Sequence, residues 1–168
     1  MTTRPTWRPL LDAAQCAFLR GPMAINVASR DDALVASIAR AYGCKISKNR
    51  RRVHVFLATA RSQAVLRDLR AGGPIAVVFC LPSTHKTVQV KAPCAQIVPV
   101  EPADRRILRA YRDAFFAEIY SLGYDERFSR ALASGAIDEE TVAVTFEPVA
   151  AFEQTPGPEA GKQLAPTI

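Results

Sequence analysis

The chain has 168 residues, of which 49% are hydrophobic and 23% charged. One hydrophobic core typically gathers roughly 100 to 200 residues, so we expect one domain rather than two. No apolar run approaches the roughly 20 residues that cross a bilayer, and charges interrupt the first twenty residues, so we expect a cytoplasmic protein without a membrane segment. The formal net charge of +6 favours an anionic partner but does not choose among nucleic acid, a phosphate-bearing cofactor and an acidic substrate.

The cysteines are widely separated and form no CxxC pair. Only two histidines accompany them, and without a closely spaced cysteine pair the set does not match the spacing of a typical zinc site. We therefore expect Cys16, Cys44, Cys80 and Cys94 to be reduced, mostly buried side chains and expect no metal site.

The first half of the chain predicts a short helix followed by strands. Thr6 is a suitable N-cap, and Gly21-Pro22 ends the apolar spacing of the helix. Alternating and β-branched segments then predict strands at residues 23–29, 34–46 and 53–57. A basic segment at residues 45–52 lies in the expected hairpin between the last two.

A second helix is predicted at residues 62–71, before a Gly-Gly-Pro stop. Residues 75–81 form a continuous apolar run that is typical of a buried strand. Alternation predicts further strands at residues 84–91 and 95–100.

The second half begins with a long helix that Pro102 opens. Its apolar stripe includes Tyr111 and Phe115, and a shorter helix should cover residues 125–134. A last strand is expected over residues 141–152, with an interruption at Pro148. We divide the chain into a barrel domain, residues 1–153, and a Pro/Gly-rich end, residues 154–168, which is either a tail or an extended arm over a neighbour.

Strands outnumber helices in this order, and the hairpins favour antiparallel pairing. The fold class is therefore mainly β with α (α+β), with a barrel whose closure removes the exposed edges of many strands. The helices should lie outside the barrel.

Several catalytic and nucleotide-binding motifs are absent from the sequence. There is no GxGxxG, GxxxxGK[ST], GxSxG or HExxH pattern, so a Rossmann unit, a P-loop enzyme and a simple hydrolase are disfavoured. The basic segment at residues 45–52 is compatible with a phosphate site or with a solvated hairpin tip, and no aromatic residue is interleaved with it. Nucleic-acid binding is therefore disfavoured as well.

Two segments carry groups suited to ligand binding. Ser62, beside Arg61, opens a helix and could present its hydroxyl and backbone amides to a phosphate, or it could simply cap the helix. The predicted strand at residues 84–91 concentrates hydroxyl, imidazole, amide and ammonium groups on one face. An ordinary half-exposed strand would show the same alternation.

The whole layout resembles the pyridoxamine 5'-phosphate oxidase-like FMN-binding split-barrel family. The order and spacing of segments 18–21, 52–57, 62–69, 75–79, 85–91 and 155–161 carry the resemblance. It implies a six-stranded antiparallel split β-barrel of Greek-key type with flanking helices. It also implies a homodimer with two FMN sites at the subunit interface.

By the same resemblance, two groups of residues would contact the cofactor. They are Thr59, Arg61 and Ser62 near the FMN phosphate, and His85, Lys86, Thr87 and Gln89 on the later strand. Gln63 and Ala64 stand where the family has a basic pair, and Thr87 replaces a glutamine. The end of the chain offers only Lys162 in place of the family's substrate-binding arginine and histidine, so vitamin B6 oxidation is not the first choice.

The resemblance therefore predicts an FMN-dependent oxidoreductase of unknown substrate. The alternative is a non-enzymatic binding protein for flavin, haem or another anionic cofactor on the same barrel. A scaffold that has lost its cofactor is a third hypothesis.

Overall fold

The computed structural model describes residues 9–135 and 140–164. The helices are α1 (Ala13–Leu19), α2 (Gln63–Arg70), α3 (Asp104–Ser121) and α4 (Glu126–Ala133), and a 3₁₀ turn, η1, covers Thr59–Arg61. The strands are β1 (Ala24–Arg30), β2 (Ala36–Ile46), β3 (Val53–Ala58), β4 (Ile75–Cys80), β5 (Thr87–Ala92), β6 (Gln96–Pro99), β7 (Thr141–Phe146) and β8 (Ala150–Glu153).

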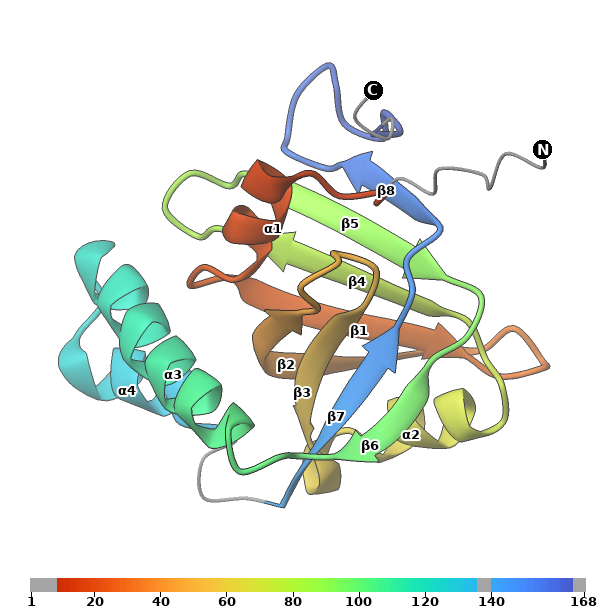
Figure 1. Ribbon diagram of the computed structural model, residues 1–168. Coiled ribbons are helices and arrows are strands. Elements are labelled where there is room, and N and C mark those ends of the chain that lie inside the picture. Colours follow the sequence, from red (N-terminus) through yellow and green to blue (C-terminus); the bar gives the residue numbers. More distant parts are fainter. Residues whose placement is uncertain (1–8, 136–139, 165–168) are drawn as a thin grey trace.

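All eight strands belong to one antiparallel sheet in the order β6-β7-β3-β2-β1-β4-β5-β8. Among the described residues no ladder joins β6 to β8, so the curled sheet is a split rather than a closed barrel. The α3–α4 pair lies on one side of it, with α1 at the top and α2 at the bottom (Figure 1). The predicted α+β class is confirmed.

The number of strands differs from the six that the resemblance implied. The expected last strand at residues 141–152 is two strands, because Pro148 interrupts it and its halves pair at opposite ends of the sheet. β7 pairs with β3 and β6, whereas β8 pairs with β5.

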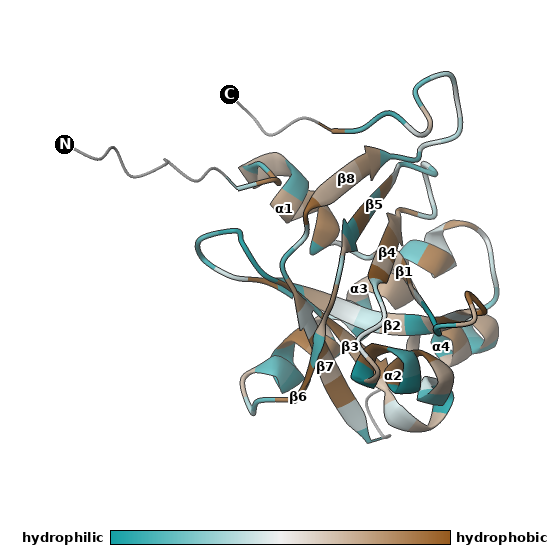
Figure 2. Ribbon diagram, turned by 90° about the vertical axis from the view of Figure 1, so that its right-hand side faces the viewer, coloured by the Kyte–Doolittle hydropathy of each residue, from teal (hydrophilic) through white to brown (hydrophobic). Residues whose placement is uncertain are grey.

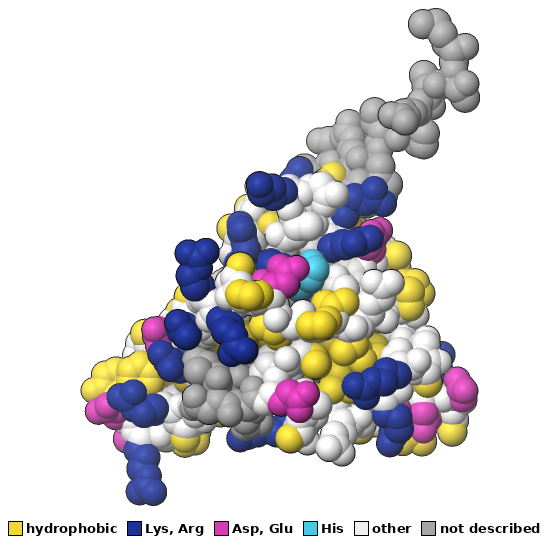
Figure 3. Space-filling view, turned by 60° about the horizontal axis from the view of Figure 1, so that its bottom comes forward, with side chains coloured by type: hydrophobic (Ala, Val, Ile, Leu, Met, Phe, Trp, Pro, Cys, Tyr) yellow, Lys and Arg dark blue, Asp and Glu magenta, His cyan; other side chains and the backbone are white. Residues whose placement is uncertain are grey.

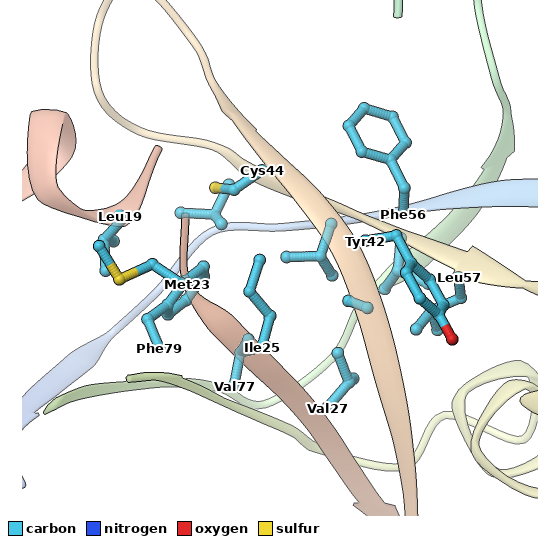
Figure 4. Packing of buried hydrophobic residues seen from close by; sticks show 14 of the residues in the cluster. Leu19, Met23, Ile25, Val27, Tyr42, Cys44, Phe56, Leu57, Val77 and Phe79 are labelled. Atoms are coloured by element: carbon cyan, nitrogen blue, oxygen red, sulfur yellow. The ribbon is translucent and has the colours of Figure 1, made fainter. Parts of the chain in front are cut away.

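The barrel interior is filled by alternate side chains of the strands. Ile25 and Val27 of β1 and Val77 and Phe79 of β4 have no exposed surface, while their strand neighbours point outward. Leu19 and Met23 close the same core next to α1 (Figure 4). Burial of these apolar side chains supplies most of the drive to fold.

A second apolar layer lies between α3 and the outer face of β2 and β3. Tyr111 and Phe115 of α3 are buried there, as the stripe of the long helix predicted. Gly43 lies at the irregular β2–β3 pairing and has a φ of 111°. The side of Gly43 on which a Cβ would lie faces Tyr111. The Tyr111 hydroxyl donates a 2.7 Å hydrogen bond to the Met23 carbonyl, which ties the helix to the barrel.

Helix α1 begins later than the sequence suggested. Asp12 caps it, accepting a 2.7 Å hydrogen bond from the Gln15 backbone amide, and the Gln15 side chain accepts from the Asp12 amide in return. This capping box satisfies two backbone donors at once, which a threonine cap alone does not. The expected cap, Thr6, lies outside the described residues.

The end of the chain folds back on its own barrel over the part that the structure describes. The Glu153 amide donates to the Lys162 carbonyl at 2.9 Å, and the Leu164 amide donates to the Ala151 carbonyl at 2.8 Å. A single bridge joins Phe152 to Gln163. Residues 154–164 therefore cover the free edge of β8.

The four cysteines are free: Cys16 and Cys44 are buried, Cys80 is half-buried and Cys94 is exposed. None of the described helices is long and apolar enough to cross a membrane.

Candidate functional site

The first half of the predicted site lies where β3 ends and α2 begins. The Thr59 amide donates a 2.8 Å hydrogen bond to the Glu140 carbonyl, and Ser62 precedes α2 with only 2% of its surface exposed. The Oγ1 of Thr59 and the Oγ of Ser62 are buried, and neither has a hydrogen-bond partner among the described residues. Such a hydroxyl costs about 1–3 kcal/mol until an acceptor reaches it.

Charge at this junction is limited. Arg61 is exposed on η1, and both residues at the positions of the family's basic pair, Gln63 and Ala64, are exposed and neutral. The eight-residue helix α2 adds the partial positive charge of its N-terminus. The junction therefore offers hydrogen-bond donors more than formal charge.

The second half of the predicted site is the β4–β5 hairpin, and the expected strand over residues 84–91 is wrong at its start. Strand β5 begins only at Thr87, so His85 and Lys86 belong to the turn. His85 has a φ of 57°, in the left-handed region, and its amide donates to the Leu81 carbonyl at 2.9 Å. The chain must reverse here, and that requirement overrides the alternation of residue types. The Lys86 ammonium lies 4.9 Å from the centre of the Phe18 ring.

The next two predicted residues differ in accessibility. The Thr87 hydroxyl is buried and donates to the His85 carbonyl at 2.8 Å, so it holds the turn. Gln89 is half-buried on the outer face of β5, and its Oε1 accepts a 3.4 Å hydrogen bond from the Gln154 side chain. Gln89 is thus the better placed of the two to meet a ligand.

Within one subunit the two halves lie on strands that are not neighbours. Three strands, β2, β1 and β4, separate β3 from β5 in the sheet. Measured along the curled sheet, with strands about 4.8 Å apart, the separation is roughly 19 Å.

A row of side chains crosses the outer face between them. Gln89 is the ladder partner of Val78, Val78 of Asn26, and Asn26 of Arg40; we call these four residues the outer row. Arg40 is not among the residues predicted from the sequence. Its Nε and Nη2 are buried without a hydrogen-bond partner among the described residues, and its guanidinium carbon lies 4.6 Å from the centre of the Phe115 ring. A charged residue among the small and apolar residues at the start of β2 was the available signal.

The outer face beyond Arg40 is uncovered. Ile38 is 70% exposed, and Ala28, Ala76 and Val78 are half-buried although they lie in central strands. Within the described parts of the chain no helix packs extensively against β4 or β5. Accessible apolar side chains on central strands, beside the polar members of the outer row, are typical of an interaction surface.

No family model and no curated protein matches the sequence. Among solved structures, a candidate pyridoxamine 5'-phosphate oxidase from Lactobacillus delbrueckii superposes with a TM-score of 0.51 at 12% identity, covering 84% of this chain and 93% of that protein. HupZ from Group A Streptococcus superposes with a TM-score of 0.52 at 12% identity, covering 90% of this chain and 99% of that one. This chain has the pyridoxamine 5'-phosphate oxidase-like fold. At such low identity the similarity shows the fold alone.

The residues of the basic segment at 45–52 lie in two different environments. Its tip is a hydrophilic turn between β2 and β3 (Figure 2), where Arg52 pairs with Glu147 at 3.1 Å. Lys45 instead pairs with the buried Asp104 at 2.7 Å, which raises the pKa of the lysine. His54, opposite Lys45 in the ladder, has its pKa lowered by burial and by the Lys45 charge.

Proposed function

We propose that this chain is an FMN-dependent oxidoreductase that works as a homodimer. The observation that carries the proposal is the pair of buried hydroxyls without partners, Thr59 and Ser62, at the place where the sequence resemblance puts the FMN phosphate. The fold, shared with a candidate pyridoxamine 5'-phosphate oxidase, supports the same assignment.

The residues present suit a phosphate held mainly by hydrogen bonds. Thr59 and Ser62 would donate to its oxygens, and the N-terminus of α2 would add its dipole. Arg61 would add formal charge from the exposed side of η1.

At the other half of the site, Lys86 and Gln89 would lie near the flavin ring. An ammonium near the ring would favour its reduced, anionic form. Thr87 and His85 would act as positioning residues, since the Thr87 hydroxyl donates to the His85 carbonyl. Bound FMN supplies the electron-transfer chemistry, and the protein places the ring and excludes water.

A second copy of the chain would complete the site. The uncovered face of β1, β4 and β5 is built largely of small side chains, so two copies can meet on it through a two-fold axis. The outer row then lies in the interface, and the two predicted halves, which three strands separate on one subunit, can each be completed by the partner.

The experiment is FMN titration of the purified full chain, followed by absorbance and flavin-fluorescence quenching, with NADH and NADPH oxidation measured afterwards. We expect one FMN per subunit and flavin-dependent oxidation of a nicotinamide. The control is a Thr59→Ala/Ser62→Ala double variant, which should bind FMN at least about tenfold more weakly. Colourless protein that takes up no added FMN would contradict the proposal.

One observation favours the alternative, a binding protein without turnover. Gln63 and Ala64 leave the phosphate site without the positive charge that the family's basic pair would supply, so this site should hold FMN less tightly. A Soret band with added haem, or flavin uptake without nicotinamide oxidation, would support this alternative.

A further inference from the structure

A cavity lies outside the predicted cofactor site, between the β6–β7 edge of the barrel and the start of α3. It has a volume of about 530 Å³, within the usual range for small-molecule sites. Its wall is apolar, with Val98, Val100 and Val142 at the β6–β7 edge and Leu108 on α3. We call it the β6–α3 cavity.

Two arginines stand at this cavity. Arg105 and Arg109 are four residues apart on α3, so their exposed side chains lie on one face of the helix. Figure 3 shows basic side chains gathered over this part of the molecule beside an apolar patch.

Some basic groups of α3 and α4 are paired, whereas within the described parts of the chain Arg105 and Arg109 are not. Arg106 and Arg127 are unpaired there too, so it is the place at the cavity that distinguishes Arg105 and Arg109. Arg112 pairs with Asp113 at 2.8 Å, and Arg130 forms an ion pair with Glu126. Over residues 9–135 and 140–164, the side chains of Arg105 and Arg109 have no ion pair or hydrogen bond. Like charges at this spacing repel, so an anion between them would stabilise the helix.

The charged residues that line the cavity determine which ligand charge it favours. Glu140 contributes one carboxylate, so the two arginines leave a net charge of +1 at the cavity. Arginine binds carboxylate or phosphate oxygens through two parallel hydrogen bonds. An apolar wall with two guanidinium groups at its rim suits a molecule that is apolar at one end and anionic at the other.

We propose that the β6–α3 cavity binds an amphipathic small anion, in which Arg105 and Arg109 hold the carboxylate or phosphate and the apolar wall holds the body. This goes beyond the proposed function, because the site needs no flavin. The cavity adjoins the proposed phosphate site at the β3–α2 junction. Glu140 borders the cavity, and its backbone carbonyl accepts a 2.8 Å hydrogen bond from the Thr59 amide.

The test uses the full chain without added FMN and a fluorescent amphipathic anion, anilinonaphthalene sulfonate. Neutral phenylnaphthylamine, which has the same rings without the sulfonate, is the matched probe. We expect saturable binding of one sulfonate probe per subunit, and at least about tenfold weaker binding in an Arg105→Gln/Arg109→Gln variant. The neutral probe should bind more weakly and respond little to these substitutions.

An Arg70→Gln/Arg127→Gln variant is the control, because it removes the same charge from exposed positions elsewhere. Equal losses in the two variants, or equal binding of both probes, would overturn the proposal. Displacement of the sulfonate probe by one equivalent of FMN would also overturn it, because the cavity would then be part of the cofactor site.

Discussion

At the scale of single residues, the most informative feature is a polar atom that lacks a partner. Ser62 and Ser129 are both buried serines whose Oγ atoms have no hydrogen bond among the described residues. They differ in place: Ser62 lies at the proposed phosphate site and Ser129 lies in α4. Each hydroxyl is an energetic cost to the unliganded fold.

We predict that Ser62→Ala leaves the unliganded protein as stable as before, or up to about 1 kcal/mol more stable, and weakens FMN binding about tenfold. Ser129→Ala is the matched control: it should change the stability by the same amount as Ser62→Ala but leave the FMN affinity unchanged. Urea unfolding and flavin-fluorescence titration measure the two effects. Equal FMN affinities in the wild type and the Ser62→Ala variant would rule out contact between this hydroxyl and the cofactor.

A second prediction at this scale concerns Asp68, which is buried beside β2. The Ser37 hydroxyl donates to its carboxylate at 2.6 Å and holds the pKa of Asp68 below its ordinary value, with Arg67 acting in the same direction and burial opposing both. A lowered pKa in the folded state stabilises the protein above the ordinary carboxyl pKa. That stability disappears as the pH falls through the lowered value.

Ser37→Ala should therefore destabilise the protein most near neutral pH, and the difference from wild type should shrink from about pH 5 to about pH 2. Urea unfolding at a series of pH values measures it. Ser121→Ala removes a hydrogen bond to the backbone carbonyl of Glu118, which does not titrate. Its stability difference from wild type should therefore not depend on pH. A Ser37→Ala difference that stays constant into acid would show that the carboxylate is not involved.

At the scale of elements, much of the fold could be predicted because its signals are local. Alternation and apolar runs located most strands, and the stripe of α3 gave its buried face, including Phe115. The turn at His85 could not be predicted from alternation, because a left-handed residue in a hairpin depends on how the flanking strands pair. The separate partners of β7 and β8 are long-range facts that no local pattern contains.

The contact between α3 and the barrel depends on a glycine. Gly43 has a φ of 111°, and a Cβ there would lie 3.4 Å from the Tyr111 Cβ. Gly43→Ala should therefore cost about 1–3 kcal/mol in the free energy of unfolding, from backbone strain at a buried position and from the new Cβ contact with Tyr111. Gly72→Ala is the control, since Gly72 has a φ of 88° but a Cβ there would meet nothing within 4 Å. Denaturant unfolding should show the larger loss for Gly43→Ala; equal losses would mean that the helix contact adds nothing.

At the scale of the whole molecule, the candidate site was only partly predictable. The sequence located the junction at Thr59 and Ser62, but the burial of both hydroxyls emerges only when β3, β7 and α2 come together. Arg40 belongs to the outer row only because the strands pair in this register, with Asn26 of β1, Val78 of β4 and Gln89 of β5 in line with it. The site is therefore a property of the assembled sheet and, on our proposal, of two such sheets.

The homodimer gives the last prediction. Val78 lies in the middle of the outer row on the uncovered face, and a two-fold interface places the same patch of both copies together. Val78→Glu should bring two larger, negatively charged side chains into the middle of the interface, so dimer formation and FMN binding should be lost together while the monomer stays folded. Light scattering after gel filtration, circular dichroism and FMN titration measure these effects.

Leu122→Glu, at an exposed position in the α3–α4 turn, should change neither dimerisation nor FMN binding. If Val78→Glu leaves the dimer intact, the two copies meet on another surface, and if it yields a monomer that still binds FMN, one subunit alone forms the cofactor site.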